Sequence, residues 1–120
     1  MAGRVAIASR TPAAPLQPNE FDRRRIERAL EARQRYRYVR PSVVPVDGGY
    51  RIESPCCSRN IDPDGGIIDV ALLLYADRYG HWRLFRKDHE RKSWEFHSTY
   101  LRLHELLDGL NTDVDRTFWQ

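Results

Sequence analysis

Apolar residues first recur at helical spacing a few positions after Asn19, which predicts an N-terminal helix. Ile26 and Leu30 stand four residues apart and fall on one face of that helix. Asn19 is a favourable N-cap residue, and Asp22 follows three positions later, where an acidic side chain stabilises a helix N-terminus. Pro41 disfavours a helical conformation in the residue before it, so the helix ends by residue 39 or earlier. The apolar stripe is narrow, and arginines occupy most of the remaining surface.

The period then changes, and β-forming runs replace the helical pattern. Residues 43–46 and 50–53 flank an Asp-Gly-Gly turn and are typical of a hairpin. Pro45 lies inside the first arm, which favours an edge strand because proline has no backbone N–H to donate. Residues 67–75 are apolar on both faces. This pattern indicates a central strand that is covered on each side at least in part.

Two more β-forming runs, residues 82–86 and 94–97, are separated by a charged turn at 88–92. Side chains alternate between the two faces of a strand, so one face of this pair collects large apolar residues. We expect that core face to carry Trp82, Leu84, Trp94 and Phe96.

A second helix is predicted to begin at Ser98 or Thr99. Its apolar face carries Tyr100, Leu103, Leu106, Leu107 and Leu110. Gly109 and Asn111 are typical of a helix C-terminus.

The resulting element order is α-β-β-β-β-α, and the short links between consecutive strands favour antiparallel pairing. We predict a two-layer α+β fold with an N-terminal helix, a four-stranded antiparallel meander and a C-terminal helix. The helices would cover one face of the sheet. Residues 1–18 are expected to form a flexible N-terminal arm, and residues 19–120 a single α+β domain.

Composition narrows the class of protein. The chain has 120 residues, of which 41% are hydrophobic and 31% charged, and these values fit one soluble globular domain. The longest apolar run is too short to cross a bilayer, and we expect no secretory signal. Membrane, collagen-like, fully disordered and disulfide-scaffold classes are excluded. Cys56 and Cys57 are adjacent and would strain a mutual disulfide, so we expect two free thiols in a reducing cytoplasm.

Charge is concentrated near the first helix, where residues 21–40 hold eight arginines against three acidic residues. Guanidinium groups contact phosphates and carboxylates at two points, and tyrosines between them could stack on bases. A nucleic-acid-binding surface at 23–40 would use Arg23, Arg24, Arg25, Arg28, Arg35, Tyr36, Arg37, Tyr38 and Arg40. The alternatives are a solvated helix face, head-to-tail self-association, and docking to an acidic protein.

Metal-binding patterns are weak in this sequence. If the strands at 82–86 and 94–97 pair around Glu90, His81 and His97 approach each other, and Cys56 or Cys57 could complete a zinc site. Structural zinc motifs usually contain a closely spaced ligand pair, which is absent here, so ordinary surface histidines are favoured. The same holds for His89 and His104.

Two further runs resemble known motifs only in part. Residues 62–66 start like a calcium loop, but the glycine and the last ligand fall at the wrong positions. His104-Glu105 lacks the second histidine of the zinc-protease helix motif, so we interpret it as the polar face of the second helix. No nucleophile, phosphate-loop or dinucleotide motif is present. We therefore expect no enzyme activity, no metal and no cofactor.

The aromatic spacing of the C-terminal half resembles a known family. Trp82-x-Leu84-Phe85, a short charged turn, Trp94-x-Phe96, a leucine-rich helix and Asp115-x-x-Phe118-Trp119 are similar to the bacterial domain of unknown function 3024 family. The resemblance implies a bacterial origin and a small cytoplasmic protein. It brings no functional residues, because the family has no established activity.

Two functions follow as hypotheses. The first is a small non-enzymatic bacterial interaction or regulatory protein that acts through a protein partner, because catalytic motifs are absent and the charge is unevenly distributed. The alternative is a nucleic-acid-binding protein that uses residues 23–40.

Overall fold

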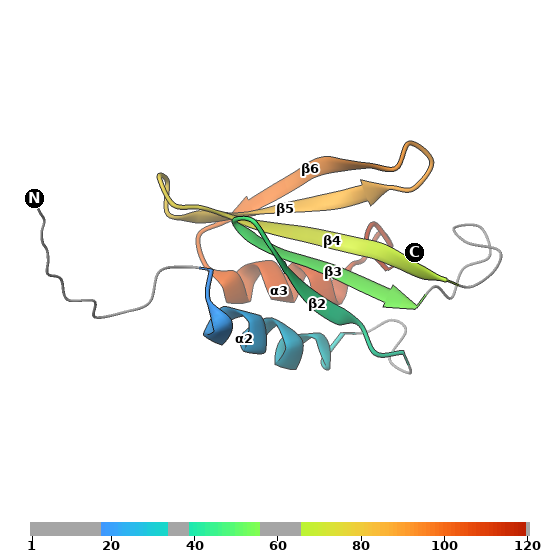
Figure 1. The fold of residues 1–120 in the computed structure, drawn as a ribbon, viewed down its shortest axis with the longest axis horizontal. Coiled ribbons are helices and arrows are strands. Elements are labelled where there is room, and N and C mark those ends of the chain that lie inside the picture. The colour runs from blue at the N-terminus through green and yellow to red at the C-terminus, as the bar shows by residue number, and fades with distance from the viewer. Residues whose placement is uncertain (1–17, 34–38, 56–65, 120) are drawn as a thin grey trace, which may run out of the picture.

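The computed structural model describes residues 18–33, 39–55 and 66–119, and within them the chain forms two helices and one sheet. The elements are α2 (Glu20–Leu30), β2 (Ser42–Val46), β3 (Gly49–Pro55), β4 (Ile67–Ala76), β5 (His81–Asp88), β6 (Ser93–Tyr100) and α3 (Leu103–Thr112) (Figure 1). Both helices lie on one side of the sheet, which gives the predicted two-layer α+β arrangement. The predicted N-terminal arm lies outside the described residues except for Pro18.

The sheet has five strands, so the predicted number of four is wrong. The order is β2-β3-β4-β5-β6, and each strand is antiparallel to the next, as expected for a meander. Both arms of the first hairpin are full strands, because β2 pairs with β3 from Ser42 opposite Glu53 to Val46 opposite Gly49. Pro45 is tolerated there because β2 is an edge strand, as predicted.

The start of α2 confirms the predicted N-cap. The Asn19 side chain accepts hydrogen bonds from the backbone N–H groups of Phe21 (2.9 Å) and Asp22 (3.1 Å). The Asp22 carboxylate accepts one in return from the Asn19 N–H at 3.3 Å, which completes a capping box. Tyr50, on β3, donates its hydroxyl hydrogen to the Asn19 carbonyl and so ties this cap to the sheet.

The core lies between the sheet and the helices. Ile26 and Leu30 enter it from α2, and the predicted leucines of α3 enter it from the other helix. The sheet contributes Val43, Tyr50, Ile52, Val70, Ala71, Leu73, Trp82 and Leu84, and the C-terminal segment contributes Phe118 and Trp119. Asn111 on α3 donates its side-chain amide to the Ala29 carbonyl at 2.7 Å, which links the two helices directly.

The predicted core face of β6 is wrong. Trp82 and Leu84 are buried, but Trp94 is half-buried and Phe96 is 57% exposed on the opposite face. Leu84 pairs with Ser98 whereas Phe85 pairs with Phe96, so one extra residue is inserted in β6. A one-residue bulge reverses the alternation of all side chains beyond it.

The second helix also begins later than predicted. Ser98 and Tyr100 pair with β5, so the strand continues to Tyr100 and α3 starts at Leu103. The helix runs past Gly109 and ends with Asp113, which has a left-handed φ of 39°. The cross-strand hydrogen bonds to β5 therefore outweigh the helical pattern over these residues.

The C-terminal segment is fixed by one buried carboxylate. Asp113 accepts hydrogen bonds from the backbone N–H groups of Thr117 (2.8 Å), Phe118 (3.1 and 3.2 Å) and Trp119 (2.7 Å). The Trp119 indole N–H donates to the Leu110 carbonyl at 2.9 Å. These contacts hold both terminal aromatic rings against the end of α3.

Candidate binding groove between the two helices

A groove of about 510 Å³ runs between α2 and α3 on the outer surface of the helical layer. The two helices begin at the same end of the molecule and run in the same direction beneath the sheet (Figure 1). The groove is lined by Phe21, Arg24, Arg25, Arg28 and Ala29 of α2 and by His104 and Leu107 of α3.

Helical spacing explains why these residues share the groove. Arg24, Arg25 and Arg28 stand one turn apart from one another or less, on the side of α2 that faces away from Ile26. Phe21 lies one turn before Arg24 and Arg25 and is 68% exposed. The groove thus combines apolar side chains with three cationic ones.

The groove arginines are only partly neutralised. Arg24 lies 3.8 Å from Glu20, and Arg25 lies 3.6 Å from the buried Asp22. Arg28 makes no ion pair within the described parts of the chain. Exposed ion pairs contribute little to stability, so these guanidinium groups remain available to an incoming carboxylate.

Asp22 connects the groove to the helix cap. Burial raises the pKa of its carboxyl, and the Asn19 N–H and the Arg25 guanidinium offset only part of that effect. Ionised Asp22 is therefore less favourable in the folded chain than in the unfolded one. The stability that protonated Asp22 contributes is fully present below pH 3.8. It is lost as the pH rises through the higher pKa that Asp22 has in the folded state.

The variant Asp22→Asn tests this assignment, because it keeps an acceptor oxygen at the cap but cannot ionise. We expect the stability of Asp22→Asn relative to the wild type to improve as the pH rises from below 3.8 towards neutrality. Urea unfolding of both proteins across that range measures the difference. A stability difference that does not change with pH would contradict the raised pKa.

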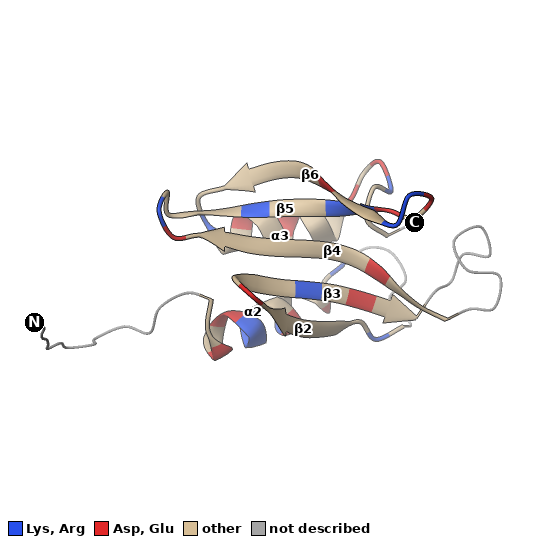
Figure 2. Ribbon diagram, turned by 45° about the horizontal axis from the view of Figure 1, so that its top comes forward, with Lys and Arg blue, Asp and Glu red and all other residues tan. Residues whose placement is uncertain are grey.

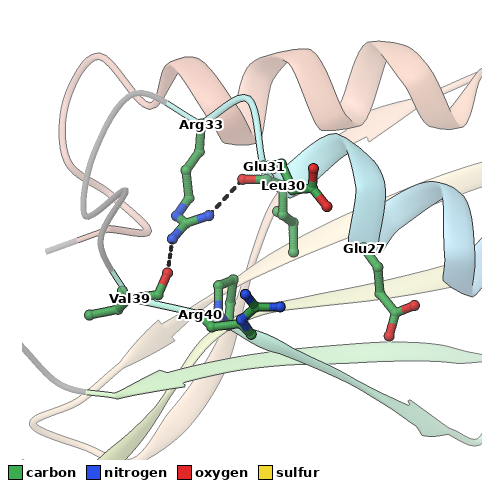
Figure 3. Close-up of a pocket in the computed structure, with 7 residues that line it drawn as sticks. Glu27, Leu30, Glu31, Arg33, Val39 and Arg40 are labelled. Carbon is green, nitrogen blue, oxygen red and sulfur yellow. Dashed lines mark hydrogen bonds between the residues drawn. The ribbon is translucent and has the colours of Figure 1, made fainter.

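Arg40 lies on the other side of α2, in a second hollow of about 510 Å³ (Figure 3). Glu27, Glu31 and Arg33 also line this hollow. Arg33 is only 4% exposed, donates to the Leu30 carbonyl at 2.7 Å and to the Val39 carbonyl, and stacks 5.3 Å above the Trp119 ring. Arg33 therefore joins the end of α2 to Val39 and Trp119, and it is not accessible to a ligand.

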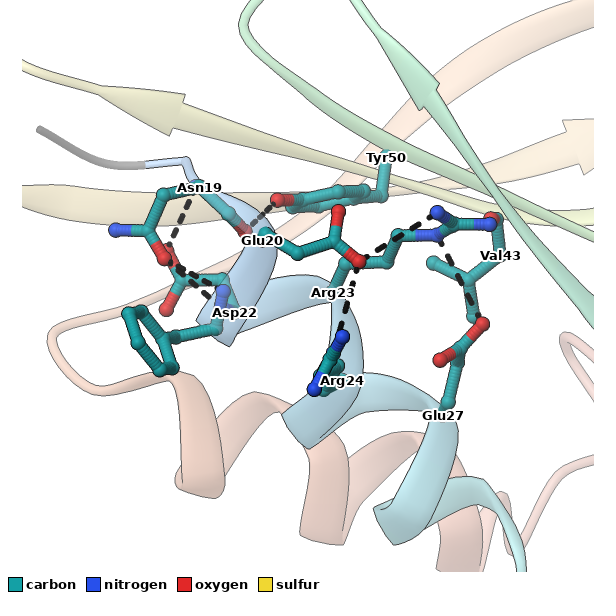
Figure 4. Close-up of polar contacts among 9 residues, drawn as sticks. Asn19, Glu20, Asp22, Arg23, Arg24, Glu27, Val43 and Tyr50 are labelled. Carbon is teal, nitrogen blue, oxygen red and sulfur yellow. Dashed lines mark hydrogen bonds and ion pairs between the residues drawn. The ribbon is translucent and has the colours of Figure 1, made fainter. Parts of the chain in front are cut away.

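Arg23 also turns away from the groove, towards the sheet (Figure 4). Its Nε–H donates to the Val43 carbonyl at 3.3 Å, which ties α2 to the edge strand β2. Its guanidinium lies 3.6 Å from Glu20 and 3.7 Å from Glu27, on its own helix. These contacts give Arg23 a structural role in joining the two layers.

The nine predicted site residues thus do not form one described surface. Only Arg24, Arg25 and Arg28 line the groove, whereas Arg23 and Arg40 lie elsewhere. Arg35, Tyr36, Arg37 and Tyr38 lie outside the described residues. The prediction missed Phe21, His104 and Leu107, because their role depends on how α2 packs against α3.

The two histidines of the hypothetical zinc site lie at different levels of the β5–β6 pair. His81 begins β5, whereas His97 lies in the β6 bulge with its ring 5.0 Å from that of Phe118. Cys56 and Cys57 lie outside the described ranges. In the part of the chain that the structure describes, no three His, Cys, Asp or Glu side chains are grouped to hold a metal ion.

Comparisons with known proteins give one match. A family described as Domain of unknown function (DUF3024) matches residues 13–120. No curated protein and no solved structure matches the chain. Among the described residues, neither helix has the length and apolar character needed to cross a membrane.

Proposed function

The chain belongs to the DUF3024 family, and we propose that it is a non-enzymatic interaction protein that binds an acidic segment of a protein partner between α2 and α3. One observation carries this proposal. Arg24, Arg25 and Arg28 line a groove together with the exposed Phe21 and the apolar Leu107. A lining that combines cationic and apolar side chains suits a segment that carries both carboxylates and apolar side chains.

The same arrangement favours protein over nucleic acid. A phosphate backbone needs a continuous cationic surface. On α2 the arginines are interleaved with Glu20 and Glu27, and Arg23 is bound to the edge strand. The apolar side chains in the lining would leave a phosphate backbone poorly solvated. A nucleic-acid role for residues 23–40 is therefore the alternative hypothesis, which the same binding experiment tests.

We further propose that the protein acts in the bacterial cytoplasm. The two cysteines are adjacent in sequence and have no second pair with which to form a disulfide framework. This pattern fits a reducing compartment.

The groove predicts a charge-dependent affinity for an acidic helix. The probe is a fluorescein-labelled peptide with glutamates on one face and leucines on the other, and binding is measured by fluorescence anisotropy. An exposed ion pair contributes about 0.2–1 kcal/mol, so replacing Arg24, Arg25 and Arg28 together by Gln should weaken binding about threefold to hundredfold. Added salt should weaken wild-type binding as well.

A matched control removes the same charge elsewhere. Arg78, Arg83 and Arg91 are exposed and lie outside the groove, so their combined replacement by Gln should leave peptide binding within about twofold of wild type. Equal losses in both triple variants would show that net charge, not the groove, attracts the peptide. The nucleic-acid alternative predicts a different result. The wild type would bind random DNA or RNA in a salt-sensitive way and would not bind the peptide, and the groove variant would lose the nucleic-acid binding.

A further inference from the structure

The side of the sheet away from the helices carries a row of facing side chains across all five strands. Val44, Arg51, Leu72, Phe85 and Phe96 are direct neighbours in the register of β2 to β6. The Phe85 and Phe96 rings lie 5.8 Å apart at 75°, in edge-to-face contact. Four of the five positions are apolar, although this face is not covered by either helix (Figure 2).

A sheet face that is exposed to water usually carries polar residues at such positions. The central strand β4 is apolar on both sides, a pattern that predicts cover on both faces. Leu73 is fully buried beneath the helices, whereas Leu72 on the open side is only half-buried. Contiguous exposed apolar side chains commonly mark an interface between proteins.

Four charged side chains on this face pair with one another, whereas the exposed Arg83, which lies on the same side of β5 as Phe85, adds one positive charge. Arg51 lies 3.2 Å from Glu53 and 3.3 Å from Asp69. Lys87 lies 3.1 Å from Asp69, and its ammonium group is 4.8 Å from the centre of the Trp94 ring. The bands of opposite charge on β3, β4 and β5 are visible in Figure 2. The two cations and two carboxylates of this group carry no net charge.

We infer that this face packs against the same face of a second copy of the chain. A two-fold axis parallel to β4 and passing through Leu72 places β2 of one copy over β6 of the other. Val44 then faces Phe96, Leu72 faces Leu72, and Arg51 lies on the ring of Phe85. An axis at right angles to β4 is disfavoured because it would place Arg51 on Arg51.

The same axis also gives charge complementarity. Glu53, Asp69 and Lys87 lie on β3, β4 and β5, in a neighbouring part of the face. Reversing the strand order places Glu53 of each copy opposite Lys87 of the other. The Asp69 side chains of the two copies face each other across this axis, but each is already paired with Arg51 and Lys87 of its own chain. Opposed charges of this kind fix the register of an interface.

The available area sets the expected strength. Five strands about 4.8 Å apart, each with about six residues rising about 3.3 Å, give a patch of about 500 Å² before side-chain relief is added. Standard interfaces bury about 800 Å² per partner, so this face lies at the lower end. We therefore expect a reversible dimer with a dissociation constant in the micromolar range.

Sedimentation velocity over a concentration series tests this dimer in the full chain. The mass should rise from the 14.1 kDa of one chain towards twice that value. Leu72→Glu should remain monomeric at every concentration, because it places two carboxylates on the axis. Phe21→Glu, in the groove between the helices, should dimerise like the wild type.

Charge exchange provides a test that does not depend on an apolar-to-charged substitution. Glu53→Lys and Lys87→Glu should each weaken dimerisation, and the double variant should restore it to within about threefold of wild type. Circular dichroism checks that each variant is folded. A wild-type protein that stays monomeric overturns the proposal, as does a dimer that Leu72→Glu and both charge variants leave unchanged. Peptide binding in the groove between α2 and α3 is measured separately, so either proposal can fail alone.

Discussion

Replacing Asp113 by alanine is expected to lower the free energy of unfolding by about 3 kcal/mol, because one carboxylate serves three backbone N–H groups. Thr117, Phe118 and Trp119 donate to it at 2.7–3.2 Å. Without it, these groups lose their acceptor, and the buried rings of Phe118 and Trp119 lose their anchor. Urea unfolding of the full chain measures the loss.

The conservative variant Asp113→Asn separates the hydrogen bonds from the charge. Asparagine keeps one acceptor oxygen and tolerates the left-handed backbone at this position, where φ is 39°. We expect it to lose about half as much stability as the alanine variant. A loss below about 0.5 kcal/mol for Asp113→Ala would show that the C-terminal segment contributes little to the fold.

Replacing Arg33 by methionine is the second large effect, with an expected loss of about 3 kcal/mol. The methionine fills similar space but cannot donate to the Leu30 and Val39 carbonyls. It also removes the guanidinium stacked 5.3 Å above the Trp119 ring. The end of α2, the approach to β2 and the C-terminal segment would therefore lose a common contact. Urea unfolding is again the measurement.

Arg40 offers a matched control for Arg33. It lines the same hollow and carries the same charge, but it is exposed and makes no ion pair within the described ranges. Arg40→Met should change the free energy of unfolding by less than about 0.5 kcal/mol. Comparable losses in the two variants would contradict the structural role assigned to Arg33.

Local signals predicted the elements well. The N-cap at Asn19 could be predicted because the signals for it, Asn19 and Asp22, lie within four residues of each other. The edge position of β2 followed from Pro45, which cannot donate a ladder hydrogen bond. Family resemblance based on the aromatic spacing after Trp82 was confirmed by the match over residues 13–120.

Features that depend on partners distant in sequence could not be predicted in this way. The bulge in β6 moves Trp94 and Phe96 to the face of the sheet away from the helices, and no local residue pattern indicates it. The burial of Arg33 could not be predicted, because it depends on Trp119 at the other end of the chain. The groove depends on how α3 packs beside α2, where Asn111 donates to the Ala29 carbonyl.

The most direct test of the proposed function is an NMR titration of the ¹⁵N-labelled protein with the glutamate- and leucine-containing helical peptide. Binding between α2 and α3 predicts the largest amide shift changes at Phe21, Arg28 and His104, which line the groove from both helices. The amides of β3 to β5 on the far side of the helical layer should change little. Saturable changes centred on the sheet, or no saturable change at all, would contradict the assignment of this groove as the site that binds a protein partner.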